Sequence, residues 1–302
     1  LTPELIAQLK EAGCAGFTVH IDSFQVRPHW KGKSEAELCE LRLHYAKMIA
    51  AVGGMSCSFN ATIYPETVKD VPMLAKWAQE HIDIVNVMVF IIYRMAILEK
   101  DYDFYVGDKK ITYEEVNYTT KSTERRTDIT SPEIVNELRK VYPDFMPSAY
   151  LNGTHDPGSF KWLLTGRMGN RHEIFGYAGP KFMEIVQTVK HLFTGSYLAY
   201  SEPKLLKMGR LYFLLSCVDK GIRSIAKNYF RSLINNPRAF FSRVHFQSVM
   251  IIQPADFMEN GDLNMCDGCP DITVWNDKLV WSCRMEEQNL WGDNVRPVAR
   301  KQ

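Results

Sequence analysis

Three cysteines near the C-terminus have the spacing of a metal site. Two residues separate Cys266 from Cys269, and Cys283 follows after thirteen more. Thiolates bind soft metals, and the short turn through Gly268 lets the first two thiolates converge. The array therefore suits an iron–sulfur cluster whose fourth position is left for another ligand or a substrate. A structural zinc site is the alternative. A disulfide pair is less favoured, because the seven cysteines are an odd number and no signal sequence is visible.

The composition is that of a folded globular protein. The 302 residues suffice for one large domain or two smaller ones, and 46% are hydrophobic and 24% charged. A net charge of +1 gives no global attraction to nucleic acid, so we expect no nucleic-acid partner. The longest apolar run, residues 84–93, is too short to cross a bilayer and is expected to be a buried strand. The start at Leu1, within a helix-like pattern, indicates the interior of a longer protein.

The first 94 residues alternate between helical and strand patterns. Helices are expected at 3–12, 34–52 and 66–81, and strands at 15–23, 56–63 and 84–92. Ser34 and Glu37 form a capping-box pattern, and Gly53 ends that helix. Such alternation predicts right-handed crossovers and a parallel sheet, in which ligands bind at the carboxyl ends of the strands. Polar residues do follow each strand there, although solvated loop starts give the same pattern.

The rest of the chain contains loops and helices. Residues 95–130 are rich in charge and carry a hairpin signal at Gly107-Asp108, which indicates an insertion, a lid or a surface loop. Helices are expected at 131–141 and 181–193. Between them, residues 152–181 contain many glycines and polar side chains. Such a loop can bind an anionic substrate, but an ordinary surface loop is the commoner case.

Residues 204–241 have the clearest amphipathic pattern, with eight Lys/Arg and one acid, Asp219. Apolar residues follow helical spacing, and Cys217 lies in their stripe, which predicts a buried thiol or a fourth cluster ligand. Four cations line another face: Lys220, Arg223, Lys227 and Arg231. A basic amphipathic helix can lie on a membrane surface, but a core-facing helix with a solvated basic face is the favoured reading.

Parts of this sequence resemble the later part of a radical S-adenosylmethionine (radical SAM) enzyme. The resemblance lies in residues 16–23, Gln25, Arg27-Pro28, residues 58–62 and the three cysteines. The cysteine spacing is similar to that of the molybdenum-cofactor cyclase of that superfamily, whose auxiliary [4Fe–4S] cluster keeps an open iron facing the substrate. Residues 176–181 and the basic helix more loosely resemble enzymes near the tetraether-lipid synthases.

The resemblance implies an α/β fold and a set of ligand contacts. The fold would be the second half of a partial (β/α)6 radical SAM barrel (1–94), an insertion or lid (95–130), a mainly helical substrate-side region (131–260) and an auxiliary cluster-binding region (261–302). Ser23, Gln25 and Asn60 would contact the ribose or methionine moiety of S-adenosylmethionine, and Arg27 would pair with its carboxylate. The auxiliary [4Fe–4S] cluster would be held by Cys266, Cys269 and Cys283.

Each of the four strand-end residues also has a plain structural reading. Ser23 and Gln25 can shape a turn. Asn60 can satisfy buried backbone, and Arg27 can form a surface ion pair.

The resemblance also implies an activity for the complete enzyme. A second [4Fe–4S] cluster would cleave S-adenosylmethionine to a 5′-deoxyadenosyl radical for C–H activation, giving an oxidoreductase or transferase-type enzyme for a small-molecule or lipid substrate. A ferredoxin or flavodoxin would donate electrons. The Cys-x3-Cys-x2-Cys loop for that cluster does not occur here. The chain is therefore expected to be truncated or a degenerate homologue, and inactive alone.

An oxygen-sensitive cluster implies a reducing, cytoplasmic location, with peripheral membrane contact if the substrate is a lipid. Two rival functions remain. One is an α/β binding protein with a structural zinc site, and the other is a peripheral lipid-binding protein.

Overall fold

The computed structural model describes residues 1–25, 27–94, 96–97, 102–113, 116, 119–120, 124–126, 128–152, 160–196, 203–257, 263–265 and 272–300. The chain divides into two compact units. Unit 1 comprises residues 1–91, 132–150 and 163–252, and unit 2 comprises residues 92–131, 151–162 and 253–302. Each unit is made of three separate stretches of chain, so its boundaries differ from those of the four segments expected from the sequence. Those four segments stay predictions.

The first half of unit 1 alternates helices and strands, as its sequence predicts. The elements are α1 (Pro3–Glu11), β1 (Gly16–His20), α2 (Glu35–Val52), β2 (Ser56–Ile63), the 3-10 helix η1 (Val68–Asp70), α3 (Val71–Glu80) and β3 (Val87–Ile92). The capping box is confirmed, because the Glu37 N–H donates to Ser34 Oγ at 3.3 Å and the Ser34 N–H donates to Glu37 Oε2 at 2.9 Å. Gly53 ends α2 with a φ of 69°, a conformation that favours glycine.

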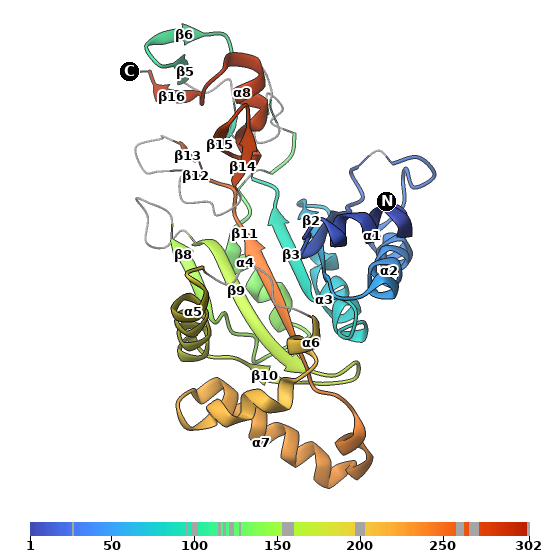
Figure 1. Ribbon diagram of the computed structural model, residues 1–302. Helices are drawn as coiled ribbons and strands as arrows, with labels where there is room; N and C mark the ends of the chain where they lie inside the picture. Colours follow the sequence, from blue (N-terminus) through green and yellow to red (C-terminus); the bar gives the residue numbers. More distant parts are fainter. Residues whose placement is uncertain are drawn as a thin grey trace. The chain divides into compact units, whose positions relative to one another are not determined.

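A seven-stranded, mostly parallel sheet joins these strands to later ones (Figure 1). Its order is β1-β2-β3-β11-β9-β10, and β8 pairs with β9. The later strands are β8 (Ala149–Asn152), β9 (Phe160–Gly169), β10 (Ile174–Tyr177) and β11 (His245–Ile252). β1 pairs with β2, and β3 with β11, in parallel, whereas β9 and β10 are antiparallel. The fold class is therefore α/β, as expected.

Part of the expected loop at 152–181 is in fact strand. The prediction was wrong for residues 160–169 and 174–177, which form β9 and β10. β9 has mostly buried residues in its second half, on both faces, so its sequence lacks the alternation that marks a half-buried strand. Its Arg167 is fully buried instead of solvent-facing.

Arg167 and Gln247 tie the sheet to α3 through buried hydrogen bonds. Arg167 Nε donates to Gln247 Oε1 at 2.8 Å, and Arg167 Nη2 donates to the Ala75 carbonyl at 2.9 Å. Gln247 Nε2 donates to the carbonyls of Ala78 and Val85, each at 2.7 Å. The two side chains thus bind carbonyls of α3, at Ala75 and Ala78, and the Val85 carbonyl just before β3.

Further helices of unit 1 follow β3 along the chain. They are α4 (Ser131–Arg139), α5 (Pro180–Thr194), α6 (Pro203–Leu206), η2 (Gly209–Cys217), α7 (Lys220–Asn235) and η3 (Pro237–Phe241). Ile222, Ile225 and Tyr229 of α7 pack with Phe175 and Phe182 in one buried cluster. A Cβ on Gly221 would lie 2.3 Å from the Tyr177 carbonyl oxygen, so glycine lets α7 approach β10 this closely.

The amphipathic stretch at 204–241 is four short elements instead of one helix. The break comes at Asp219, whose Oδ1 accepts from the Ile222 N–H at 2.8 Å and so starts α7. Cys217, expected to be buried, is exposed, because it ends η2 just before this new helix begins.

The described residues of unit 2 form short strands, the helix α8 and a 3-10 helix. Its elements are β4 (Ala96–Ile97), β5 (Tyr102–Val106), β6 (Lys109–Ile111), β7 (Thr119–Thr120), β12 (Ala255–Phe257), β13 (Leu263–Met265), β14 (Ile272–Trp275), β15 (Lys278–Trp281), η4 (Ser282–Arg284), α8 (Met285–Trp291) and β16 (Arg296–Ala299). The expected hairpin at Gly107-Asp108 is confirmed as β5–β6, and β16 pairs with β5. Phe104, Tyr113, Val116 and Val295 form a small core.

We predict that Asp219→Ala destabilises unit 1 by about 2–4 kcal/mol. Asp219 is buried, and besides capping α7 it accepts from the N–H groups of Gly179 and Phe182, both at 3.0 Å. Alanine removes the cap and leaves two buried amides unpaired. Urea unfolding measures the loss. Asp144→Ala, at an exposed aspartate, is the matched control and should change the free energy of unfolding by less than about 0.5 kcal/mol. Equal effects of the two substitutions would contradict the role given to Asp219.

Candidate functional site

The carboxyl ends of β1 and β2 meet at one edge of the sheet. The strands are parallel, His20 lies opposite Asn60, and the Ile21 N–H donates to the Asn60 carbonyl at 2.9 Å. The loop after β1 therefore begins beside Asn60. Of the four residues predicted from the sequence, Ser23, Gln25 and Arg27 lie in the loop after β1, and Asn60 lies within β2, opposite the last residue of β1.

Asp22 shapes the loop that follows β1. Its buried Oδ1 accepts from the N–H groups of Phe24, at 3.0 Å, and Gln25, at 3.1 Å, as in an Asx turn. Its Oδ2 lies 3.0 Å from Nε2 of His20, and the same nitrogen lies 2.9 Å from Oγ1 of Thr62 on β2. Burial raises the pKa of Asp22, but the contacts with His20, the Phe24 N–H and Thr62 outweigh it and lower the pKa overall.

Arg27 folds back onto the same loop. Its Nη2 donates to the His20 carbonyl, and its Nε donates to Gln25 Oε1 at 3.0 Å. The guanidinium thus lies at the end of β1 and holds the Gln25 carboxamide by its oxygen. The plain reading of Arg27 as a surface ion pair is replaced by this internal contact, and Gln25 does take part in a turn.

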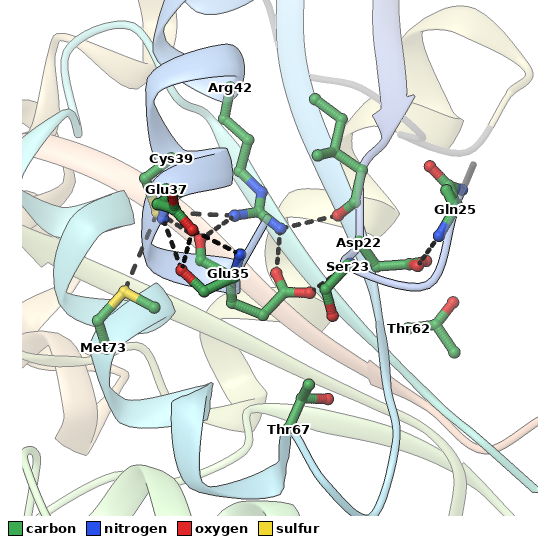
Figure 2. Close-up of polar contacts among 12 residues, drawn as sticks. Asp22, Ser23, Gln25, Glu35, Glu37, Cys39, Arg42, Thr62, Thr67 and Met73 are labelled. Carbon is green, nitrogen blue, oxygen red and sulfur yellow. Dashed lines mark hydrogen bonds and ion pairs between the residues drawn. The ribbon is translucent and has the colours of Figure 1, made fainter. Parts of the chain in front are cut away.

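A buried ion pair behind the loop fixes its backbone (Figure 2). Glu35 and Arg42 lie on α2, both almost fully buried, with Glu35 Oε2 2.5 Å from Arg42 Nη2. Glu35 Oε1 accepts from the Ser23 N–H at 2.7 Å. Arg42 Nη2 donates to the Ile21 carbonyl at 2.8 Å, and Nη1 donates to the Glu35 carbonyl at 3.0 Å. One pair therefore holds the chain on both sides of Asp22.

Sequence reasoning missed this ion pair. The sequence does contain a signal for it, because Glu35 and Arg42 are two helical turns apart and lie among the apolar residues through which α2 packs into the core. A glutamate and an arginine at that spacing on an apolar face indicate a buried pair, since a lone buried charge is too costly. The capping-box motif at Ser34 involves Glu37 instead. Glu37 is exposed and forms an ion pair with Lys33 at 2.7 Å.

Two polar atoms on β2 are buried with no described hydrogen-bond partner. They are Asn60 Oδ1 and Ser58 Oγ, two residues apart on the same face of the strand. The His20 side chain, on the paired strand, is 40% exposed. Buried polar atoms normally find partners, so an acceptor and a hydroxyl without them beside a partly exposed imidazole suit a polar ligand. Asn60 thus does not use its oxygen to satisfy the described backbone.

The structure describes none of the side chains of the three predicted cysteine ligands. Cys266 and Cys269 lie outside the described residues, and Cys283 lies in η4, where only its backbone is described. Within the described residues no group of three His, Cys, Asp or Glu side chains could hold a metal ion. Burial raises the pKa of the Cys57 thiol to about 12 and also raises that of Cys39, so these two are inert packing residues.

We predict that Glu35→Ala lowers the free energy of unfolding by about 3 kcal/mol or more, because Arg42 is left buried without its partner. Removing both charges in Glu35→Leu/Arg42→Met should cost less than Glu35→Ala alone. Urea unfolding compares the variants. Glu40→Ala, at an exposed glutamate of the same helix, is the control and should have an effect below about 0.5 kcal/mol. A double variant less stable than Glu35→Ala would contradict this view of the pair.

None of the helices in the described part of the chain combines the length and apolarity needed to span a membrane. Comparison of the chain with protein-family models and with curated proteins gives no match. The strand-end geometry and the sequence motifs are therefore the evidence that bears on function.

Proposed function

We propose that this chain is the later part of a radical SAM enzyme, with an S-adenosylmethionine-binding edge at β1–β2 and an auxiliary [4Fe–4S] cluster on Cys266, Cys269 and Cys283. One observation carries the proposal. Of the residues named from sequence for this ligand, Ser23, Gln25 and Arg27 follow the carboxyl end of β1, and Asn60 on the neighbouring parallel strand lies opposite that end. That edge is where α/β sheets bind ligands.

The polar groups of the edge fit the chemistry of S-adenosylmethionine. The ligand carries ribose hydroxyls and an ammonium, which donate hydrogen bonds, and a carboxylate, which accepts them. Asn60 Oδ1 is a buried acceptor with no described donor. The Gln25 oxygen is taken by Arg27, so the Gln25 NH₂ group is the part that would donate. When bound, the ligand and a reduced cluster supply radical C–H activation, and the protein's share is positioning and exclusion of water.

The strand-end residues have separate roles in this proposal. Asn60 would accept from a ribose hydroxyl, and the Gln25 amide would donate to the ligand carboxylate. Arg27 would orient Gln25 and add positive charge to the edge. Asp22 would hold His20 in place, and the Glu35–Arg42 pair would keep the Ser23 backbone fixed before ligand arrives. The substrate would be a small molecule or a lipid, reduced ferredoxin or flavodoxin the electron donor, and the setting cytoplasmic.

We predict that the full chain binds S-adenosylmethionine. Asn60→Ala and Gln25→Ala should each weaken the affinity about tenfold, because each removes one or two hydrogen bonds to a charged or polar ligand. Isothermal titration calorimetry measures the affinity. Gln8→Ala, an exposed residue of α1, is the matched amide-loss control and should leave the affinity unchanged. A folded chain without measurable affinity would refute the proposed edge, and equal loss in the Gln8 control would show that the effect is not local.

The cluster predicts that anaerobic reconstitution with iron and sulfide gives a brown protein with about four irons and four sulfides per chain. Replacing Cys266, Cys269 or Cys283 with alanine should remove most of the iron. Cys14→Ala is the control, since Cys14 lies outside the motif and its Sγ donates to the Gly16 carbonyl. Metal analysis and the visible spectrum give the readout. A colourless protein that holds one zinc ion per chain would replace the cluster by a structural zinc site.

A further inference from the structure

The segment 203–244 of unit 1 forms a surface without exposed acid. It contains nine Lys/Arg residues and one acid, Asp219. Asp219 is 1% exposed, and its carboxylate accepts from the backbone N–H groups of Gly179, Phe182 and Ile222. The charge that this segment presents to solvent is therefore positive throughout. We call α6, η2, α7 and η3 together the basic–apolar surface.

Large apolar side chains are exposed on the same elements. Phe241 is 88% exposed, Ile234 81% and Leu214 74%, while Phe230 and Phe240 are more than half exposed. On α7, Phe230 and Ile234 are one turn apart, and helical spacing places Arg223 and Lys227 on the same side. The buried face of α7, with Ile222, Ile225, Ala226 and Tyr229, is opposite. The outer face of α7 thus mixes cations with apolar side chains instead of being uniformly polar.

Contacts through Arg210 join these elements into one surface. The Arg210 guanidinium lies 5.4 Å from the ring centre of Tyr229 on α7 and 5.0 Å from that of Phe240 on η3. Its Nη2 donates to the carbonyls of Phe240 and Ser242. Phe213 of η2 lies 6.2 Å from Phe230, centre to centre. These contacts place η2, α7 and η3 side by side.

A cavity of about 280 Å³ opens on this surface, between η2 and the segment after η3. Lys207, Arg210 and Arg243 line it together with Met208, Leu211 and Phe241. Arg210 Nε is buried and has no acceptor among the described residues. Three cations and an unused donor around a partly apolar cavity suit an anionic headgroup attached to an acyl chain.

We propose that the basic–apolar surface docks on an anionic phospholipid bilayer, lying in the interface and not crossing it. Interfacial helices combine cations on one part of the surface with Phe, Leu and Ile that enter the acyl boundary. Nucleic acid would explain the cations but leave Ile234 and Leu214 in water. The inference does not rest on the proposed radical chemistry, because it uses only the charge and exposure of residues 203–244.

Vesicle flotation of the full chain tests this docking. The probes are vesicles of phosphatidylcholine alone and of phosphatidylcholine with phosphatidylglycerol. We expect strong binding only to the second kind. Lys227→Glu/Arg231→Glu should reduce that binding by well over tenfold, since each cation near an anionic surface is worth about fivefold. Ile234→Asn/Phe241→Asn should reduce it by about tenfold or more, because two apolar side chains no longer enter the acyl region.

Matched controls separate docking from general effects. Met146→Asn removes an apolar side chain that is 61% exposed elsewhere in unit 1, and Lys47→Glu/Lys76→Glu reverses two exposed cations on α2 and α3. Both should bind as the original chain does, and circular dichroism should show equal folding for all variants. Absence of binding to the phosphatidylglycerol vesicles would overturn the proposal. So would binding lost in the charge variant but intact in the apolar one, because this pattern describes a surface for soluble polyanions.

Discussion

The loop at the candidate site depends on one buried ion pair. Glu35 and Arg42 lie on α2, yet their polar atoms are used by the chain around the end of β1, at Ile21 and Ser23. Removing two charges from water is costly, and the attraction between them compensates only if further hydrogen bonds satisfy both groups. Here the Ser23 N–H and two carbonyls supply most of those bonds, while the buried Arg42 Nε has no partner among the described residues. The pair thus contributes position more than stability, since it sets the loop against the helix that follows.

The rest of unit 1 uses buried polar side chains in the same way. Arg167 and Gln247 come from β9 and β11 and donate to the carbonyls of Ala75 and Ala78 in α3 and of Val85 before β3. The Asp219 carboxylate accepts from the N–H groups of Phe182, near the start of α5, and Ile222, near the start of α7. Each of these side chains joins segments far apart in sequence through main-chain groups that would otherwise be unpaired. Such contacts specify one arrangement of the elements, because an alternative packing leaves a buried polar group without a partner.

Local features were predictable from the sequence, and long-range ones were not. The Ser34 capping box, the Gly53 helix end and the hairpin at Gly107 are set by neighbouring residues, and each was read from its own short motif. β2 has the predicted bounds, because apolar and polar residues alternate along most of it. β9 was missed, since its second half is buried on both faces and loses that alternation. β11 was missed although burial alternates along its second half. The Asp219 break was also missed, because the apolar spacing continues across it.

The same difference between local and long-range features applies to the candidate site. Strand-end logic was enough to name Ser23, Gln25, Arg27 and Asn60, because parallel strands place their carboxyl ends together. It could not show that Arg27 turns back to the His20 carbonyl, nor that α2 supplies the supporting charges, since both depend on tertiary packing. The cysteine motif was identified from the spacing of its residues alone, and Cys266 and Cys269 lie outside the described residues.

The pairing of β3 with β11 has a consequence for biosynthesis. Residues 87–91 find their neighbours at 248–252, so a ribosome must add more than half of this chain before that ladder can close. Until then β3 presents an open, apolar edge, Val-Met-Val-Phe-Ile-Ile, of the kind that recruits other nascent chains. Chaperone engagement during translation would protect that edge until the late strand arrives.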